Sequence, residues 1–199
     1  MDDIYKTIEG VSQGVYKEKG SKFIARAYHV ENEETIKEVL LTLRKEFYDA
    51  RHHCYAWRIN VRDEKTRSND DGEPSGSAGK PILNQLFSFQ LYDVLVVVIR
   101  YFGGTKLGVS GLINAYKTST REALENAKII DKEIRDLYRV DFEYPLMNSV
   151  MRIIKEDNLV ITRQHFDNQC TINLAMRLST INKSTNRLNK IQGVKLKKL

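Results

Sequence analysis

The sequence has no long hydrophobic run, only two cysteines and a single tryptophan in 199 residues. The longest apolar run is residues 94–99, whereas a membrane-spanning helix needs about 20 apolar residues. The first residues, 1–4, are acidic, so we expect neither a secretory signal nor a membrane span. Cys54 and Cys170 form no CxxC pair. Such cysteines are typical of reduced, buried thiols in a cytoplasmic protein, with a disulfide as the less favoured alternative.

Charge is unevenly distributed along the chain. Residues 1–133 carry 20 basic and 20 acidic side chains, whereas residues 134–199 carry 12 basic and 6 acidic ones, which accounts for the whole net charge of +6. Such asymmetry predicts two modules, of which the basic one is better suited to an anionic surface. We expect domains at 1–133 and 134–199.

The hydrophobic periodicity of the first module predicts an α+β fold. We expect a helix that Asn32 caps, with Ile36, Leu43 and Phe47 on one face, and a second helix that Ser110 caps. The remaining elements are predicted strands at 11–15, 23–30, 52–61 and 95–100, a loop at 62–80 and a short helix at 82–89.

The second module has the element order of a ferredoxin-like domain. We expect strands at 135–142, 160–166, 170–178 and 194–196, and helices around 147–154 and 183–191. In the first of these helices Met147, Val150, Met151 and Ile154 recur at helical spacing. The order βαββαβ is the ferredoxin-like pattern.

Two glycine-rich segments flank the apolar run 94–99. Together they hold seven of the eleven glycines, at 72, 76, 79, 103, 104, 108 and 111. Glycine allows backbone N–H groups to approach a ligand closely, and the second segment leads into a helix N-terminus, which attracts anions. Neither segment has P-loop or GxGxxG spacing. An anion site that also uses Arg100 and Lys106 is one interpretation, and glycines that only permit tight turns are the other.

Several polar residues near these segments have both a functional and a structural interpretation. Asp70, Asp71 and Glu73 could hold Mg²⁺, although a solvated acidic patch is the more common use of such a cluster. Ser75 has no base that the sequence can position. His52 is more often a structural histidine than a ligand, because no second cluster completes a metal site. Tyr101 could stack on a base or belong to the core. We therefore assign no catalytic residue, metal or cofactor.

Basic residues cluster at the end of the chain. Lys183, Arg187 and Lys190 share one helical face, and Lys195 and Lys197 follow. Such a face could bind a phosphate backbone, or it could be an ordinary solvated helix face.

The glycine-rich segments also resemble a known family. Residues 70–83 (DDGEPSGSAGKPIL) and 98–108 (VIRYFGGTKLG) are similar to the two signatures of the IMPACT/YigZ family, and 19–25 and 52–57 resemble its weaker motifs. The resemblance implies a ribosomal-protein-like α/β sandwich, with a mixed sheet and helices on one face, followed by a ferredoxin-like domain similar to one in elongation factors. Its eukaryotic members regulate translation by competing for the ribosome-associated activator of a starvation-sensing kinase. The start of the first strand near residue 1 resembles a bacterial-type member, so that partner is not carried over.

From these observations we expect a non-catalytic, cytoplasmic and monomeric regulator linked to translation or its stress control, which binds ribosome, RNA or a translation-associated protein. The alternatives are an enzyme acting on a phosphorylated or nucleotide-like small molecule, with Asp71 and Glu73 as metal ligands or acid and base, and a purely protein-binding adaptor. The expected binding residues are His52, Asp70, Asp71, Glu73, Ser75, Lys80, Arg100, Tyr101, Gly103, Gly104, Lys106 and Gly108.

Overall fold

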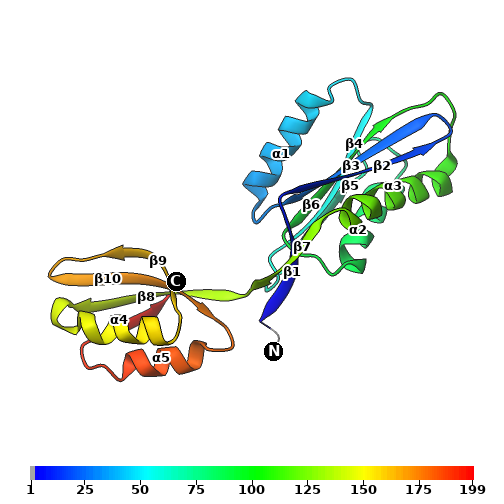
Figure 1. The fold of residues 1–199 in the computed structure, drawn as a ribbon. Coiled ribbons are helices and arrows are strands. Elements are labelled where there is room, and N and C mark those ends of the chain that lie inside the picture. The colour runs from blue at the N-terminus through cyan, green and yellow to red at the C-terminus, as the bar shows by residue number, and fades with distance from the viewer. Residues whose placement is uncertain (1–2) are drawn as a thin grey trace. The chain divides into compact units, whose positions relative to one another are not determined.

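Residues 5–131 and residues 132–199 pack into separate units in the computed structural model, which describes residues 3–199 (Figure 1). Asp3 and Ile4 group with the second unit. The Asp3 carboxylate accepts hydrogen bonds from Arg177 Nε at 2.6 Å and from Ser179 N at 3.1 Å. Met1 and Asp2, which belong to the acidic start considered above, lie outside the described residues. Among residues 3–199, no helix is long and apolar enough to cross a membrane.

The N-terminal unit is built around a five-stranded sheet with the order β2-β3-β6-β4-β5. All four strand pairings in this sheet are antiparallel. β1 and β7 form a separate two-stranded sheet. The elements that lie wholly or mostly in this unit are β1 (Ile4–Glu9), β2 (Val11–Glu18), β3 (Ser21–His29), α1 (Glu33–Glu46), β4 (His52–Ile59), β5 (Lys65–Asn69), α2 (Gly79–Ser88), β6 (Val94–Tyr101), α3 (Gly108–Glu125) and β7 (Lys128–Glu133).

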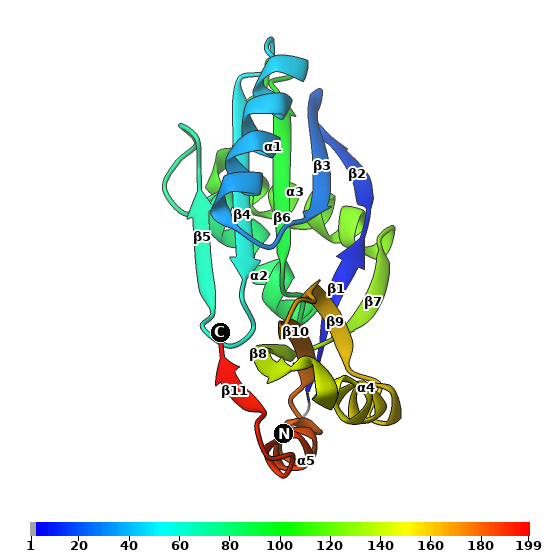
Figure 2. The ribbon, with the colours of Figure 1, turned by 90° about the vertical axis from the view of Figure 1, so that its left-hand side faces the viewer.

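Helices cover both faces of the five-stranded sheet. In the central strand β6, Val96 and Val98 belong to the core with α2 and α3, whereas Val97 and Ile99 belong to the core with α1. Figure 2 shows α1 on the near face of this sheet and α3 behind it. The α+β class is confirmed, but the expected mixed sheet with helices on one face is wrong. A strand buried on both faces explains why the run 94–99 is apolar at every position.

Of three local predictions for this unit, one is confirmed and two are wrong. Asn32 caps α1 as expected, since its Oδ1 accepts a hydrogen bond from Thr35 N at 2.9 Å. The loop predicted at 62–80 contains β5, which pairs with β4 through Lys65↔Ile59 and its neighbours. Ser110 is not the cap of α3, because the helix already begins at Gly108.

The C-terminal unit has the predicted ferredoxin-like order. Its elements are β8 (Arg135–Glu143), the 3-10 turn η1 (Tyr144–Leu146), α4 (Met147–Glu156), β9 (Val160–His165), β10 (Gln169–Arg177), α5 (Ile181–Asn189) and β11 (Lys195–Lys198). The sheet order is β11-β8-β10-β9, with antiparallel pairings. α4 and α5 pack on one face of this sheet (Figure 1), where Val150 and Leu188 meet Val140 and Phe142.

Candidate functional site

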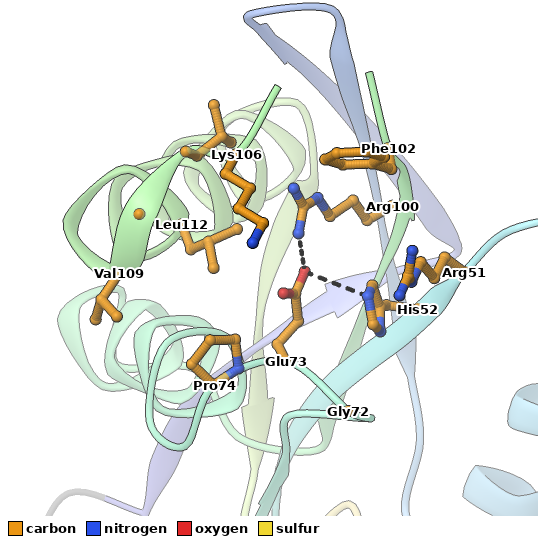
Figure 3. A pocket seen from close by; sticks show the side chains of 12 residues that line it. Arg51, His52, Gly72, Glu73, Pro74, Arg100, Phe102, Lys106, Val109 and Leu112 are labelled. Atoms are coloured by element: carbon orange, nitrogen blue, oxygen red, sulfur yellow. Dashed lines mark hydrogen bonds and ion pairs between the residues drawn. The ribbon is translucent and has the colours of Figure 1, made fainter. Parts of the chain in front are cut away.

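A recess in the N-terminal unit lies where the two glycine-rich segments meet (Figure 3). Its volume is about 390 Å³, which lies toward the lower end of the range of small-molecule sites, ~300–1,000 Å³. Residues 72–74 form one wall, and the segment from Lys106 into α3 forms another. The full lining is Arg51, His52, Gly72, Glu73, Pro74, Arg100, Phe102, Lys106, Leu107, Gly108, Val109 and Leu112.

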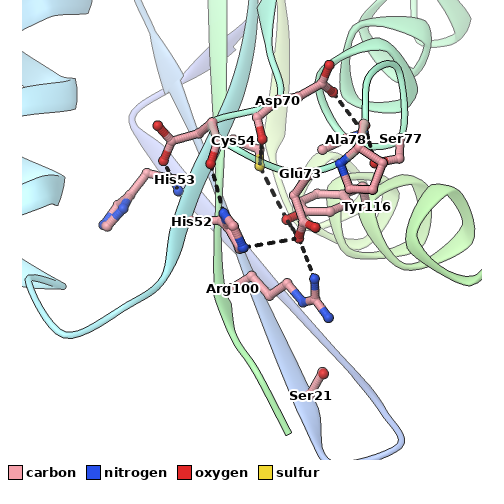
Figure 4. Close-up of polar contacts among 12 residues, drawn as sticks. Ser21, His52, His53, Cys54, Asp70, Glu73, Ser77, Ala78, Arg100 and Tyr116 are labelled. Atoms are coloured by element: carbon pink, nitrogen blue, oxygen red, sulfur yellow. Dashed lines mark hydrogen bonds and ion pairs between the residues drawn. The ribbon is translucent and has the colours of Figure 1, made fainter. Parts of the chain in front are cut away.

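Glu73 is the hydrogen-bonding centre of the recess. Its Oε1 accepts from Arg100 Nη1 at 2.5 Å and from Tyr116 Oη at 2.8 Å, and His52 Nε2 lies 4.0 Å away (Figure 4). The side chains of Glu73 and Arg100 are only 4% and 6% exposed. A buried carboxylate requires a partner of opposite charge and hydrogen-bond donors, and Arg100 and Tyr116 supply both.

The backbone of the first glycine-rich segment orients His52. Its Nδ1 lies 2.8 Å from Asp71 O, and because a carbonyl oxygen only accepts, Nδ1 carries the proton of this hydrogen bond. Nε2 therefore faces Glu73. The loop backbone therefore fixes the orientation of the ring.

Two protonatable groups beneath Glu73 stay neutral. Cys54 Sγ lies 3.0 Å from Asp70 O and 3.3 Å from Tyr116 Oη. Burial raises the pKa of the Cys54 thiol and that of the Tyr116 hydroxyl far above their ordinary values. A thiolate is the nucleophilic form of cysteine, so Cys54 is a structural hydrogen-bonding group here.

Asp70 and Asp71 hold the loop together instead of lining the recess. The Asp70 carboxylate accepts from the N–H groups of Gly76, Ala78 and Gly79 at 2.8–3.0 Å, which anchors the loop to the start of α2. Asp71 Oδ2 accepts from His53 N at 2.7 Å, and Oδ1 pairs with Arg44 at 3.0 Å. Among residues 3–199, no group of three His, Cys, Asp or Glu side chains is placed to hold a metal.

The second glycine-rich segment contributes the start of α3. The N-cap residue is Leu107, no side chain in the described range 3–199 caps the helix, and its first turn contains no acidic residue. Gly103 has a different role, since a Cβ there would come within 1.9 Å of Gly20 C. Gly103 therefore permits a close approach between this segment and the β2–β3 turn.

The structure divides the residues that the sequence singled out. His52, Glu73, Arg100, Lys106 and Gly108 line the recess. Tyr101 lies elsewhere, since its hydroxyl donates to Asp49 Oδ1 at 2.8 Å and its ring packs with the α1 side of the sheet. Also outside the lining are Asp70, Asp71, Ser75, Lys80, Gly103 and Gly104.

Sequence reasoning missed Arg51, Phe102 and Tyr116. Phe102 had a usable signal, because side chains two residues apart on a strand share a face, and Phe102 follows Arg100 at that spacing at the end of β6. Tyr116 stood alone as a polar-tipped aromatic residue on a helix face of mostly small residues, which marked it as a partner for some buried polar group.

The basic residues of the C-terminal unit also separate into two sets. On α5, Lys183 and Arg187 form ion pairs with Asp157 at 3.2 and 2.5 Å, and Arg187 also pairs with Glu156. Lys190 is exposed next to them. Lys195 and Lys197 lie on β11, where both are exposed.

The comparisons with known proteins identify the family of this chain. The model of the Impact N-terminal domain matches residues 19–124. The IMPACT family member YvyE of Bacillus subtilis is 32% identical over 162 residues, which cover 81% of this chain and 75% of YvyE. The chain belongs to the IMPACT family. The family resemblance seen in the motifs is thereby confirmed.

Two further comparisons, one with a family member and one with a solved structure, agree. The IMPACT family member YigZ of Escherichia coli is 36% identical over 138 residues, or 68% of each chain. A crystal structure described as a hypothetical protein is 26% identical, covers 98% of this chain and 97% of its own, and has a TM-score of 0.78. The fold of this chain is therefore similar to that of a solved structure along almost the full length of both chains.

Proposed function

We propose that this protein is a non-catalytic regulator linked to translation or its stress control, and that it acts in the cytoplasm by binding RNA. Membership of the IMPACT family supports the link to translation, since the family resemblance implies regulation of translation by its eukaryotic members. The neutral, buried state of Cys54 and Tyr116 and the engaged carboxylate of Asp71 support a binding role over a catalytic one.

The observation that carries RNA binding is the helix-free face of the C-terminal sheet. Side chains alternate between the two faces of a strand. In β8, Val140 and Phe142 are buried against α4 and α5, so Arg139 and Asp141 point to the opposite face, where Arg139 is exposed. The part of this face around Arg139 is therefore polar, whereas Leu137 and Val160, which are 46% and 42% exposed, give it an apolar end.

Three cations form a row across this face. In the strand register, Lys197 on β11 lies opposite Arg139 on β8, and Arg139 lies opposite Asn173 on β10. Asn173 in turn lies opposite Arg163 on β9. Neighbouring strands lie ~4.8 Å apart, so the row spans the sheet. We name this set, together with Lys195, the basic sheet face. Asp141 and Glu143 are acidic side chains on the same face of β8, and Arg139 forms an ion pair with Asp141 at 2.8 Å.

Phosphate is the ligand chemistry that this row fits. Lysine and arginine that neutralise phosphates release counterions, which makes nucleic-acid binding salt-dependent. The α5 face that the sequence also singled out is less suited, because Asp157 forms ion pairs with both Lys183 and Arg187. Lys195, Lys197 and Arg163 have exposed side chains, as Lys190 does. What favours the basic sheet face is that a carboxylate engages one of its cations, Arg139, whereas Asp157 engages two of the cations of α5.

The test is the affinity of the full chain for single-stranded RNA, measured by fluorescence anisotropy at increasing KCl concentrations. The double variant Arg163→Gln/Lys197→Gln should weaken binding and reduce the slope of log K against log salt by about 1.4, at about 0.7 for each lost phosphate contact. The matched control is Lys183→Gln/Lys190→Gln, which removes the same charge from α5 and should change the slope less.

Two results would count against the proposal. Equal losses in both double variants would mean that net charge, rather than the basic sheet face, determines binding. Partner binding that persists at high salt and after RNase treatment would favour the protein-binding adaptor instead.

A further inference from the structure

We propose that the recess of the N-terminal unit is a binding site for a phosphate monoester of a compact small molecule. This site lies entirely within residues 51–112, whereas the basic sheet face lies within residues 139–197. The proposal therefore goes beyond RNA binding and does not rest on it.

The charge of the recess matches such a ligand. Arg51, Arg100 and Lys106 line it together with one carboxylate, Glu73, which leaves a net charge of +2 when His52 is neutral. A phosphate monoester carries about −1.5 to −2 near pH 7. Opposite charges of similar size favour this class over cationic or neutral ligands.

Arg100 is a buried cation that keeps an unused hydrogen-bond donor. It is 5% exposed, its Nη1 donates to Glu73, and its Nε has no hydrogen-bond partner among residues 3–199. The guanidinium lies 5.3 Å from the centre of the Phe23 ring and 5.7 Å from that of Phe102. These contacts hold its orientation before any ligand arrives, and a planar guanidinium is well suited to phosphate oxygens.

The start of α3 supplies further donors on another wall. The first four N–H groups of a helix lack partners within it. Within the part of the chain that the structure describes, neither a capping side chain nor an acidic residue occupies this end of α3. Gly108 and Val109 of this turn line the recess beside Lys106. An uncapped helix N-terminus that faces the same space as a buried arginine is an arrangement suited to an oxyanion.

The rest of the lining indicates what the phosphate is attached to. Pro74, Phe102, Val109 and Leu112 give the recess apolar walls, and Phe102 is 45% exposed. The volume of about 390 Å³ limits the ligand to a compact molecule. We therefore infer a phosphate ester with a small apolar or aromatic group, for which phenyl phosphate is a suitable probe.

The experiment follows backbone amide shifts of the full chain during titration with phenyl phosphate and, separately, with inorganic phosphate. We expect the largest shifts at residues 106–112 and tighter binding of phenyl phosphate, because only that probe contacts the apolar walls. Lys106→Gln, an exposed residue whose loss spares the core, should weaken phenyl phosphate binding by about tenfold. Lys80→Gln is the matched control and should not weaken it.

The proposal is overturned if neither probe shifts these amides, or if Lys80→Gln weakens binding as much as Lys106→Gln. A second experiment distinguishes a small phosphate ester from the 5′-phosphate of an RNA as the ligand of the recess. RNA with a 5′-phosphate and RNA with a 5′-hydroxyl should bind equally well, whereas displacement of the probe by 5′-phosphorylated RNA alone would assign the recess to RNA. The RNA affinity of Lys106→Gln tells the two proposals apart. If it is unchanged while phenyl phosphate fails to bind, the phosphate-site proposal is wrong and the RNA-binding proposal is unaffected.

Discussion

Replacing Arg100 by methionine should strongly destabilise the N-terminal unit. The substitution retains most of the side-chain length but leaves the Glu73 carboxylate, 4% exposed, with Tyr116 as its remaining hydrogen-bond donor. Removing one partner of a buried ion pair costs about 3–5 kcal/mol. By contrast, Arg44→Met breaks an ion pair with Asp71 in which Arg44 is 52% exposed, and this should cost less than about 1 kcal/mol.

Urea unfolding monitored by tryptophan fluorescence measures both variants. Trp57 is the only tryptophan in the chain and is buried in β4, so the signal reports on this unit alone. Adding Glu73→Gln to Arg100→Met should recover part of the lost free energy of unfolding, because no uncompensated charge then remains buried. If Arg100→Met costs no more than Arg44→Met, or if the double variant recovers nothing, the assignment of Glu73 and Arg100 as a coupled pair is wrong.

Two further predictions concern stability. Gly103→Ala should lower the free energy of unfolding, measured from the Trp57 signal in urea, by about 1–3 kcal/mol, because its Cβ would lie 1.9 Å from Gly20 C. An unchanged urea midpoint would show that the fold does not depend on the close approach of these two segments. Hydrogen bonds from Arg177 and then Ser179 hold the pKa of Asp3 far below its ordinary value. This stabilisation is therefore present above about pH 3.9 and is lost as the pH falls through the lowered pKa. The difference in stability between wild type and Asp3→Asn, followed by far-UV circular dichroism, should thus shrink below pH 4, and a constant difference would contradict it.

The helices and strands that could be predicted from the sequence are those whose pattern of apolar residues matches the side that they bury. The apolar run 94–99 became the central strand, and the stripe of Val150 and Ile154 became the buried side of α4. β5 was missed because Lys65–Asn69 is an exposed edge strand of polar residues, which shows none of the alternation of a half-buried strand. Which face each helix covers was also not predictable, because both faces of β6 are apolar.

The site depended on contacts between residues that are distant in sequence. Glu73 was recognised as a candidate, but its partners Arg100 and Tyr116 lie 27 and 43 positions away. Asp70 resembled a cation ligand because its three backbone donors become visible only once the loop has folded. In the same way, Asp157 neutralises the α5 cations from 26 and 30 positions away, so the charge pattern overestimated how basic that face is.

The most direct test of the proposed function is to map the RNA-binding surface on the full chain. Backbone amide shifts should be recorded during titration with a short single-stranded RNA at low salt. We expect the largest shifts on β8, β9, β10 and β11 around Arg139, Asn173, Arg163 and Lys197. Shifts confined to α5, or no shifts in the C-terminal unit while RNA is bound, would contradict the assignment of the basic sheet face.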